Sequence, residues 1–446
     1  MDSHRHQNAW VVSVNMGYGH ARAAYGLEDL AHGGIVTANE YPGIPSRDRE
    51  LWRKSRDSYE FISRLQPLPV IGKIAFSFLD YLQRIPEFYP RRDLSKPTLQ
   101  LRYVYHLIRK KNLGKHLVEK LGKKPLPLVS TFFNMGFAAE EHDYPGDIYL
   151  VTTDADISRA WVPLDPKKSR IKYFASNGRV VERLKLYGVK EENIFLTGFP
   201  LPKKLVGGPE AGIVKKDLSA RICNLDPNAI FIKKYQKVLL DELGAELCEF
   251  KKKHPLTLTF TVGGAGAQRE LGIDIVNGLR KRLLQNEIQI NLEAGIRPEV
   301  ADFFEREVRK LRLGKLLGKN IHIHVYPDRQ TYFRAMNDTL RKTDILWTKP
   351  SEMSFYSGIG LPIIMAPAIG SQEAFNKLWL ESAVNAGTSQ LDPAYCGEWL
   401  FDWINSGGLA KYAWNGYIEA PTHGTYRIES VLTGEKMPIA DLPMIV

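Results

Sequence analysis

Short apolar runs recur along the chain, and longer stretches of mixed polar and apolar positions separate them. Such runs, rich in Val, Ile, Leu and aromatic residues and closed by Gly, Pro, Asn or Asp, predict buried strands. In the first 200 residues they occupy positions 9–16, 126–133, 147–154, 171–177 and 193–200. Residues 20–33 and 178–188 have the spacing typical of helices, and each of these helices follows a predicted strand.

A second alternating set follows further along the chain. Its predicted strands occupy residues 256–264, 288–295, 320–327, 344–348 and 361–367, and helical sequence separates them. Strand–helix alternation that occurs twice predicts two α/β domains, each built on a parallel sheet. In such sheets ligands bind beyond the carboxyl ends of the strands.

The domain boundaries follow from the places where this alternation stops. We predict an N-terminal, acceptor-side domain over residues 1–203, which contains an aromatic, basic insert at 42–125. Residues 204–232 hold Gly and Pro without a sustained period, so they are predicted to join the domains. A C-terminal domain is predicted over 233–394, and the tail 395–446 is expected to pack back on the N-terminal domain.

The positive charge is concentrated in one part of the insert. The chain has 446 residues and a formal net charge of +11, and residues 91–124 hold eleven Lys or Arg against Asp93 and Glu119. A block of this kind attracts phosphates of an anionic membrane surface or of nucleic acid, or forms a solvated helix face. Because apolar residues such as Leu101 and Tyr105 alternate with the charges, we favour the membrane surface over nucleic acid.

Other compositional features bound the class of protein. No apolar run reaches the ~18 residues that span a bilayer, and the apolar stretch that ends at Met16 is too short for a signal peptide. We therefore expect a cytoplasmic enzyme, peripheral on the inner membrane face. Cys223, Cys248 and Cys396 have neither metal-binding nor disulfide spacing, so no metal site is predicted.

The first candidate loop is "NMGYGH", between a predicted strand and helix. Gly17 and Gly19 allow backbone amides to turn toward a bound group at the positive end of the helix. His20, at the start of that helix, has the chemistry of a general base near neutral pH. The alternative is a tight turn with His20 as a helix-start residue.

The second candidate loop follows the strand at 147–154. Asp154 and Asp156 lie where that strand ends, so either carboxylate could orient His20 or accept a proton itself. Asp154 is the candidate catalytic residue, and Asp156 is assigned to the loop that contacts the acceptor. The alternative is that either aspartate caps the next helix or turn.

Two further loops belong to the C-terminal domain. In "VGGAGAQ", Gly263, Gly264 and Gly266 separate a strand from a helix, which suits a diphosphate resting on backbone amides. The sequence is neither a Walker motif nor a GxGxxG fingerprint. After two later strands come polar residues suited to bind ribose hydroxyls and base edges, or simply helix-start and solvated positions: Lys349, Ser351, Glu352, Gln372, Glu373.

This order of motifs resembles the GT-B glycosyltransferases of the group that contains monogalactosyldiacylglycerol synthase, processive diacylglycerol glycosyltransferases and the peptidoglycan N-acetylglucosaminyltransferase. "MGYGHARAA" is similar to the GGGH-type first loop of that family, with His20 at its histidine. Thr153, Asp154 and Trp161 resemble its "TD…W" stretch. "GGAGAQ", with Gln268, resembles its donor loop, and Thr348, Lys349, "GLP" (360–362), Gln372, Glu373 and Asn376 resemble its "TKxG…GLP…GQExxN".

The resemblance implies two Rossmann-like parallel-sheet domains that face a cleft, the GT-B architecture. It further implies a nucleotide-sugar donor, expected to be a UDP-sugar, bound without metal or cofactor on the C-terminal domain. The chain departs from the family in one place that bears on the ribose, because Phe355 occupies the position of a glutamate five residues before the Gly of "GLP". Glu352 is the nearby carboxylate that could replace it.

The hypothesis is a glycosyltransferase that moves a sugar to an acceptor hydroxyl on a lipid or lipid-linked molecule, with inversion. His20 would deprotonate the hydroxyl, with Asp154 positioning or replacing it, and the donor loops would stabilise the departing diphosphate. The alternatives are a nucleotide-sugar epimerase and a non-catalytic basic protein that binds membrane or nucleic acid.

Overall fold

The computed structural model describes residues 8–54, 84–244, 254–263, 266, 268–368 and 370–444. The chain forms two compact units. Unit 1 contains Met1–Pro200, Gly370–Phe375 and His423–Val446, and unit 2 contains Leu201–Ile369 and Asn376–Thr422. Within the described ranges, no helix is both long and apolar enough to cross a membrane.

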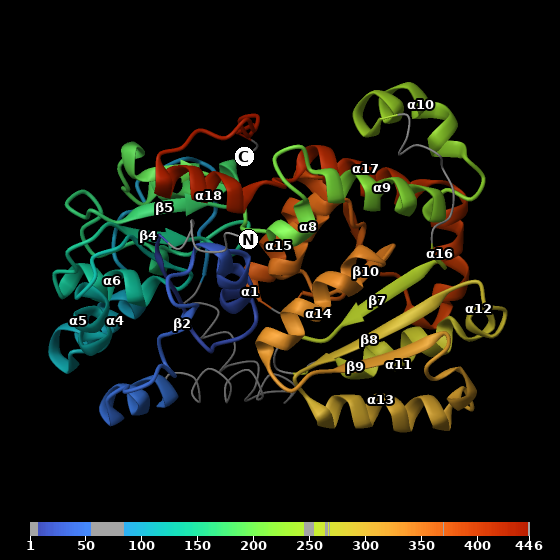
Figure 1. Ribbon diagram of the computed structural model, residues 1–446, viewed down its shortest axis with the longest axis horizontal. Coiled ribbons are helices and arrows are strands. Elements are labelled where there is room, and N and C mark those ends of the chain that lie inside the picture. Colours follow the sequence, from blue (N-terminus) through green and yellow to red (C-terminus); the bar gives the residue numbers. More distant parts are fainter. Residues whose placement is uncertain are drawn as a thin grey trace. The chain divides into compact units, whose positions relative to one another are not determined.

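Unit 1 is built on a six-stranded parallel sheet with strand order β2-β1-β3-β4-β5-β6. Figure 1 labels β2, β4 and β5 of this sheet. The strands are β1 (Trp10–Ser13), β2 (Val36–Thr37), β3 (Leu128–Ser130), β4 (Ile148–Val151), β5 (Lys172–Ala175) and β6 (Ile194–Leu196). Since β2 and β3 lie on opposite sides of β1, the strand order reverses between β1 and β3. That reversal is the switch point, where open α/β sheets bind ligands.

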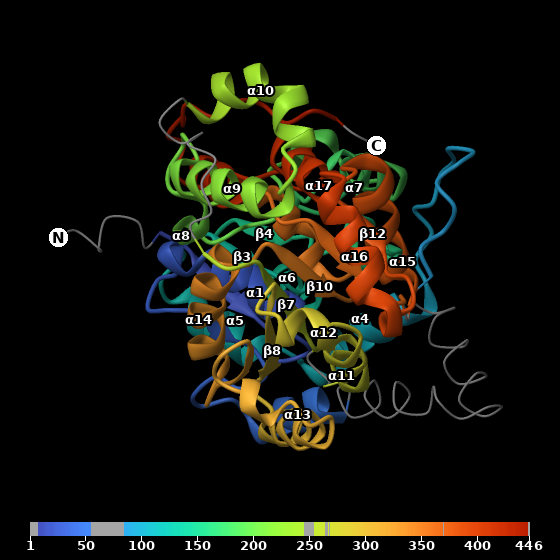
Figure 2. The same cartoon turned by 90° about the vertical axis from the view of Figure 1, so that its right-hand side faces the viewer.

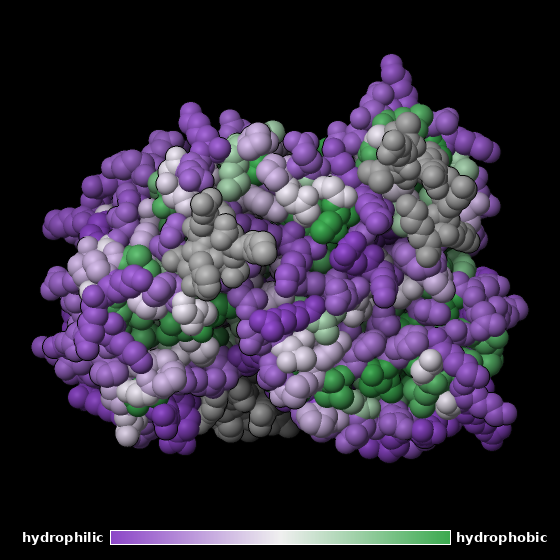
Figure 3. All heavy atoms as spheres, in the orientation of Figure 1, coloured by the Kyte–Doolittle hydropathy of each residue, from purple (hydrophilic) through white to green (hydrophobic). Residues whose placement is uncertain are grey.

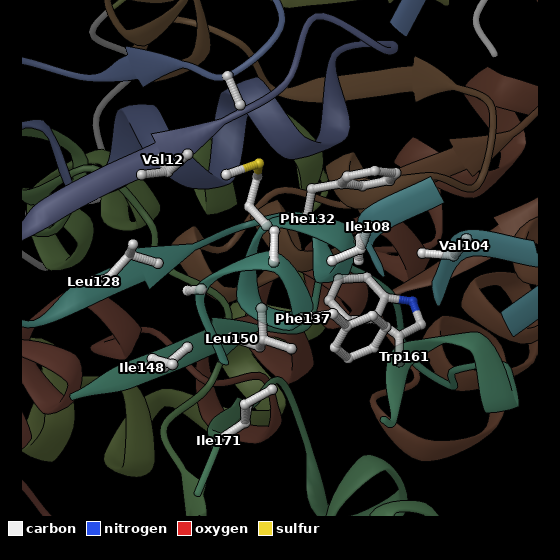
Figure 4. Packing of buried hydrophobic residues seen from close by; sticks show 14 of the residues in the cluster. Val12, Val104, Ile108, Leu128, Phe132, Phe137, Ile148, Leu150, Trp161 and Ile171 are labelled. Atoms are coloured by element: carbon white, nitrogen blue, oxygen red, sulfur yellow. The ribbon is translucent and has the colours of Figure 1, made fainter. Parts of the chain in front are cut away.

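The core of unit 1 holds large apolar side chains from the strands and from the helices that pack on them. These helices are α1 (Gly19–Gly26), α4 (Leu99–Lys111), α5 (Lys115–Gly122), α6 (Phe133–Glu141) and α7 (Gly178–Leu186). Figure 4 shows Val12, Leu128 and Leu150, from three adjacent strands, in one packed layer with Phe137. This burial explains why the short apolar runs of the sequence form strands.

Unit 2 contains the other six-stranded parallel sheet, with strand order β12-β11-β10-β7-β8-β9. Its strands are β7 (Thr257–Thr261), β8 (Gln289–Gly295), β9 (Ile321–Val325), β10 (Ile345–Thr348), β11 (Ile363–Met365) and β12 (Gly387–Ser389). Numbered within the unit, this is the Rossmann order 6-5-4-1-2-3, and its switch point lies between β7 and β10. The predicted pair of Rossmann-like parallel-sheet α/β domains is therefore confirmed.

The helices of unit 2 include α9 (Gly212–Leu225), α10 (Ile230–Leu243), α11 (Arg269–Gly278), α13 (Pro298–Lys310), α14 (Arg329–Arg341), α16 (Cys396–Asn405) and α17 (Gly408–Glu419). Helix α15 (Ser371–Leu378) begins in unit 1 and ends in unit 2. Helix α13 packs along β8 and β9, and α9 lies beside α17 (Figures 1 and 2). The buried guanidinium of Arg221 in α9 donates hydrogen bonds to the carbonyl oxygens of Thr343, Ile359 and Gly360, which fixes α9 to the sheet.

The structure differs from the predicted boundaries in three places. Edge strands β2 and β12 were not predicted. Residues 204–232, expected to form a joining segment, contain α9 and the start of α10 and belong to unit 2. The predicted tail divides, because α16 and α17 belong to unit 2, whereas α18 (Gly424–Thr433) belongs to unit 1.

Candidate functional site

His20 lies at the switch point of the first sheet. It is the second residue of α1, after the loop that follows β1, and its Nδ1 atom is 2.6 Å from the carbonyl oxygen of Thr131, directly after β3. A carbonyl oxygen only accepts hydrogen bonds, so Nδ1 carries the proton that it donates. In the neutral imidazole the lone pair is then on Nε2, which is the tautomer that a general base requires.

Thr131 also binds the start of α1 through its own side chain. Its hydroxyl donates to the backbone carbonyl of His20 over 2.9 Å, and its own N–H donates to the carbonyl of Val12 over 3.0 Å. The preceding Gly17 has a φ of +88°, a conformation that favours glycine. Gly19 is the first residue of the helix. The loop therefore brings His20 to the switch point by a glycine turn and two reciprocal hydrogen bonds.

Aromatic side chains surround the imidazole. The ring of Phe132 meets it edge-on with centroids 4.9 Å apart, and the ring centroid of Trp161 lies 6.2 Å away. Phe133 packs on Trp161 at 5.4 Å. Figure 4 shows how Phe132 and Trp161 lie in this part of unit 1. Trp161 comes from the segment after β4. The segments that follow three neighbouring strands, β1, β3 and β4, therefore all contribute to the surroundings of His20.

The loop after β4 is held by the loop after β5. The hydroxyl of Ser176 donates to the carbonyl of Asp154 over 2.7 Å, and the side-chain amide of Asn177 donates to the carbonyl of Ala155 over 3.0 Å. These bonds hold the main chain at Asp154 and Ala155. Asp154 itself is half-buried directly beyond the end of β4.

Asp156 was predicted to lie in a loop that contacts the acceptor, but its side chain is turned into the protein instead. Its side chain is fully buried, and its two oxygens accept hydrogen bonds from Arg183 Nε and Nη2, each at 2.8 Å. Arg179 Nε donates to the same carboxylate over 2.8 Å. Both arginines lie on one face of α7, four residues apart, and they stack on Phe88. A carboxylate that accepts hydrogen bonds from two guanidinium groups anchors the loop to α7, so we assign Asp156 a positioning role.

Two of the predicted donor loops begin side by side at the switch point of the second sheet, where β7 and β10 end. The hydroxyl of Thr261, the last residue of β7, donates to the hydroxyl of Thr348, the last residue of β10, over 2.8 Å. Beyond them, a Cβ atom added to Gly263 would lie 3.0 Å from Lys349 Cε and 3.7 Å from Lys349 Nζ. The side chain of Lys349 therefore lies over the Gly263 backbone, and a side chain at position 263 would have to displace the end of the lysine.

The rest of the glycine-rich loop turns toward neighbouring strand ends. The N–H of Gly266 donates to the carbonyl of Gly263 over 2.7 Å, and Gln268 Nε2 donates to the carbonyl of Pro367, after β11, over 3.3 Å. Gly266 has a φ of +69°, and a Cβ there would lie 3.1 Å from Cδ of Arg297. Arg297, which follows β8, is a cation at this edge of the sheet that the sequence reading missed. Gly264 lies outside the described residues.

The loop after β10 leads into a buried 3₁₀ helix, η5 (Glu352–Ile359). The N–H of Ser351 donates to the carbonyl of Lys349 over 2.8 Å, and Glu352 is buried at the start of η5. Phe355, at the position where the resembled family has glutamate, is a core residue whose ring packs on Trp379 with centroids 4.9 Å apart. Glu352 is therefore the carboxylate nearest to Lys349 along this loop.

The three remaining candidates are on α15. Asn376 is buried in unit 2, and its Nδ2 donates to the carbonyl of Pro350 over 3.4 Å, which attaches α15 to the Lys349 loop. Gln372 and Glu373 are half-buried in the first turn of α15, in the short segment that belongs to unit 1. Across the described ranges, no group of three or more His, Cys, Asp or Glu side chains is arranged to hold a metal ion.

A sequence profile for DUF6938, a domain of unknown function, matches residues 245–392, a span that contains all six strands of the second sheet. No curated protein matches the chain in sequence. Solved structures with similar folds include the UDP-GlcNAc 2-epimerase of Neisseria meningitidis bound to UDP-GlcNAc, at 12% identity and a TM-score of 0.46. The match covers 96% of this chain and 100% of that one.

A glycosyltransferase from Rickettsia africae matches at 11% identity and a TM-score of 0.42, over 96% of this chain and 99% of that one. The UDP-GlcNAc 2-epimerase of Methanocaldococcus jannaschii, in complex with UDP-GlcNAc and UDP, matches at 13% identity and a TM-score of 0.45, over 96% and 99% of the two chains. Identities and TM-scores of this size are too low to transfer an activity.

Proposed function

We propose that the protein is a glycosyltransferase that moves a sugar from a nucleotide-sugar donor, a UDP-sugar, to a hydroxyl of a lipid or lipid-linked acceptor, with inversion. One observation carries the proposal: each sheet has a distinct set of chemical groups at its switch point. Lys349 lies over Gly263 in unit 2, and His20, with its proton on Nδ1, lies in unit 1. A histidine whose proton is held on Nδ1 presents a basic Nε2, which suits a catalytic role.

The donor half of the proposal rests on Lys349 and the glycine-rich loop. A diphosphate needs positive charge and backbone N–H donors close together, and a glycine lets the phosphate oxygens approach the main chain. Lys349 and Arg297 supply the charge on either side of the loop that runs from Gly263 to Gly266. The same groups would stabilise the negative charge that develops on the leaving diphosphate. Ribose recognition by Glu352 belongs to this half of the proposal.

The acceptor half rests on His20. Nε2 takes the proton of the acceptor hydroxyl as its oxygen attacks the anomeric carbon of the donor sugar. The bond between that carbon and the diphosphate oxygen breaks, and UDP leaves with the electron pair. Attack opposite to the leaving group inverts the anomeric carbon. The products are a glycosylated acceptor and UDP, with the proton on His20 until it passes to solvent.

A membrane-borne acceptor is supported by the basic helices of unit 1. Leu99 and Tyr103 on α4 are 76% and 62% exposed, and Lys110 and Lys111 at its end are also exposed. On the face drawn in Figure 3, the surface over α4 and α5 is mainly hydrophilic with small hydrophobic groups. Exposed apolar side chains beside cations suit an anionic lipid surface.

The test is a product analysis with a panel of nucleotide-sugars and membrane lipids as acceptors. A transferase releases nucleotide only when acceptor is present, and the acceptor gains the mass of the sugar. Conversion of the nucleotide-sugar without nucleotide release would identify an epimerase instead. Failure to bind any nucleotide would favour the non-catalytic binding protein.

A further inference from the structure

A pocket opens in unit 1 between edge strand β2 and helix α5. Its volume is ≈ 380 Å³. Strand β2 has a neighbouring strand on one side only, and Leu117 and Leu121, one turn apart on α5, contribute to the lining. Figure 3 shows hydrophobic residues at the surface between the positions that α5 and β2 occupy in Figure 1. The proposed function does not use this pocket.

The walls of the pocket are apolar. Ile35 and Val36 come from the edge of the sheet, the ring of Trp10 comes from β1, and Leu117 and Leu121 come from α5. Ile35, Val36 and Trp10 pack against the apolar cores of unit 1, yet each stays half-buried. Part of their apolar surface is therefore open to a ligand, in a pocket of the size that small molecules occupy.

Two polar aromatic side chains of the lining have their hydrogen-bond partners inside the protein. Trp10 Nε1 donates to the carbonyl of Lys124 over 2.8 Å, and the hydroxyl of Tyr41 lies 2.9 Å from Nδ1 of His116. The hydroxyl of Thr37, on β2, is the other uncharged polar side-chain group among the lining residues. The pocket therefore offers a polar ligand few hydrogen bonds.

The charged groups of the lining are one cation and one carboxylate, counted among the described residues that border the pocket. Lys120 Nζ donates to the carbonyl of Pro42 over 3.0 Å, and the exposed Glu40 accepts a hydrogen bond from Asn15 Nδ2. Because these opposite charges are both exposed and both bonded to the protein, neither gives the pocket a preference for a charged ligand. An uncharged, mainly apolar ligand suits this lining.

The pocket follows the length of β2. Its lining includes Gly33, before the strand, and Glu40, beyond the carboxyl end of the strand. Asn15, the partner of Glu40, lies in the loop between β1 and α1, and that loop leads to His20. One end of the pocket therefore adjoins the first candidate loop, and a ligand that fills the pocket is elongated.

We infer that this pocket binds the hydrocarbon chain of a lipid with an uncharged head group. The chain is buried against Trp10, Val36 and Leu117, and the head lies at the end marked by Glu40, without an ionic contact. Hydroxyl groups of the head are then next to the loop that leads to His20. If the proposed function holds, this lipid is the acceptor; that identity rests on the proposed function, whereas binding of the chain does not.

The experiment measures binding to the full chain, without donor, by isothermal titration calorimetry. The probes are monomeric 1-octanoylglycerol, 1-decanoylglycerol and 1-dodecanoylglycerol, which share one head. Each added pair of methylenes should strengthen binding by up to roughly 15-fold, the fold-change that corresponds to about 0.8 kcal/mol for each buried methylene. Kd values that do not depend on chain length would overturn the inference.

A fourth probe tests the head group. Dodecanoate has a hydrocarbon chain of the same length with a carboxylate, and it should bind no more tightly than 1-dodecanoylglycerol, because Lys120 is already bonded to Pro42. Tighter binding of dodecanoate would show an ionic site for the head and overturn the inference.

Variants locate the site. Val36→Phe should fill the pocket and weaken 1-dodecanoylglycerol binding by about 10-fold or more, the equivalent of roughly two buried methylenes. Val36→Asp should also weaken it, since the chain would remove the new carboxylate from water. The matched control is Val325→Phe, the same change at an exposed residue of edge strand β9 in unit 2. With folding verified by urea denaturation, an equal loss in the control, or full binding in both Val36 variants, would overturn the inference.

Sedimentation velocity tests the alternative occupant, a second copy of this chain. Self-association of the parent protein that Val36→Phe abolishes, together with no binding of the three glycerides, would assign the pocket to an interface between copies and overturn the inference.

This test fails separately from the proposed function. Chain-length-dependent binding that Val36→Phe abolishes, without sugar transfer to any lipid, would retain the pocket and refute the transferase. Sugar transfer to a lipid without any chain-length-dependent binding in this pocket, and with a KM unaffected by Val36→Phe, would retain the transferase and refute the pocket.

Discussion

The imidazole of His20 and the carbonyl oxygen of Thr131 are joined by a 2.6 Å hydrogen bond across 111 residues of sequence. The bond connects the segment after β1 to the segment after β3 at the switch point, and it fixes the histidine proton on Nδ1. A main-chain carbonyl thus decides which ring nitrogen can act as a base. Mutation of Thr131 cannot remove this oxygen, so the histidine itself must be changed to test its role.

Replacing His20 should remove the proton acceptor and leave donor binding intact. We expect His20→Ala to lower kcat by ~10²–10⁴-fold, the usual contribution of a general base. His20→Gln should be almost as impaired, because the amide cannot accept the proton. Steady-state kinetics measures both, with His106→Ala, an exposed histidine of α4, as the control. Turnover near the parent rate in both variants would move the catalytic role to Asp154.

The two aspartates after β4 should respond differently to substitution. Asp156→Asn breaks a buried ion pair and leaves the fully buried Arg183 without its partner, which costs roughly 3–5 kcal/mol of unfolding free energy. Asp154→Asn should cost much less stability and should lower activity. Urea denaturation followed by tryptophan fluorescence compares the free energy of unfolding of the two variants with that of the parent protein. Equal stability of the two variants would contradict the anchoring role of Asp156.

Lys349 should contribute to diphosphate affinity through its charge. Lys349→Met should raise the Kd for UDP by about 10- to 100-fold, the loss of a charge-assisted hydrogen bond. Gly263→Val should have a similar effect, because a side chain there displaces the Lys349 methylenes. Calorimetry with UDP gives the Kd, and Lys342→Met, an exposed lysine at the end of α14, is the control. Unchanged affinity in both variants would refute the donor site at this switch point.

The stability of unit 2 should fall as pH rises, because of Asp344. Complete burial raises the pKa of this carboxyl to about 6, from an ordinary value of 3.8. The folded state thus favours the protonated form, so the stabilisation is full below pH 3.8 and is lost as pH rises through 6. This group alone should cost up to roughly 3 kcal/mol between these limits.

Asp344→Asn isolates that contribution, since the amide oxygen can still accept the 2.8 Å bond from the N–H of Thr257. Urea denaturation at pH 4.5, 6.0 and 7.5 should show the variant gaining stability relative to the parent as pH rises. Parallel pH profiles of the two proteins would show that Asp344 does not titrate in this range.

Membrane attraction should depend on exposed lysines of α4. Arg109, the neighbouring cation, is unsuitable for neutralisation, because it makes a two-bond ion pair with Glu141 at 2.6 and 2.8 Å. Lys110→Gln with Lys111→Gln should weaken binding to vesicles of anionic lipid by up to about 1 kcal/mol per charge, and less at high salt. Co-sedimentation measures it, with Lys233→Gln and Lys234→Gln on α10 as the control. Binding that is absent or insensitive to salt would refute the membrane proposal.

The sequence predicted the central strands because each is a short apolar run that is buried on both faces. It missed β2 and β12, since two or three half-exposed residues such as Val36 and Thr37 give no period. Similarly, the helices within 204–232 were hidden by flanking Gly and Pro, which were taken as signs of a loop.

From the sequence, the candidate site residues could be predicted only where a polar residue or a glycine directly follows a predicted strand. His20, Lys349 and Gly263 stand out in this way, but the contact of Lys349 with Gly263 follows from the pairing of β7 with β10, which sequence order does not give. Thr131 acts through its backbone and has no sequence signal. Asp156 could have been told from Asp154 by Arg179 and Arg183, which are spaced for one helix face.

Hydrogen–deuterium exchange with and without UDP is the decisive test of the donor site. We expect slower amide exchange in residues 257–263 and 345–352 when UDP is bound, and no such change in Lys349→Met at the same concentration. ADP and GDP serve as comparisons for the base. Protection confined to unit 1, or no binding of any of the three nucleotides, would contradict a nucleotide-sugar site between β7 and β10.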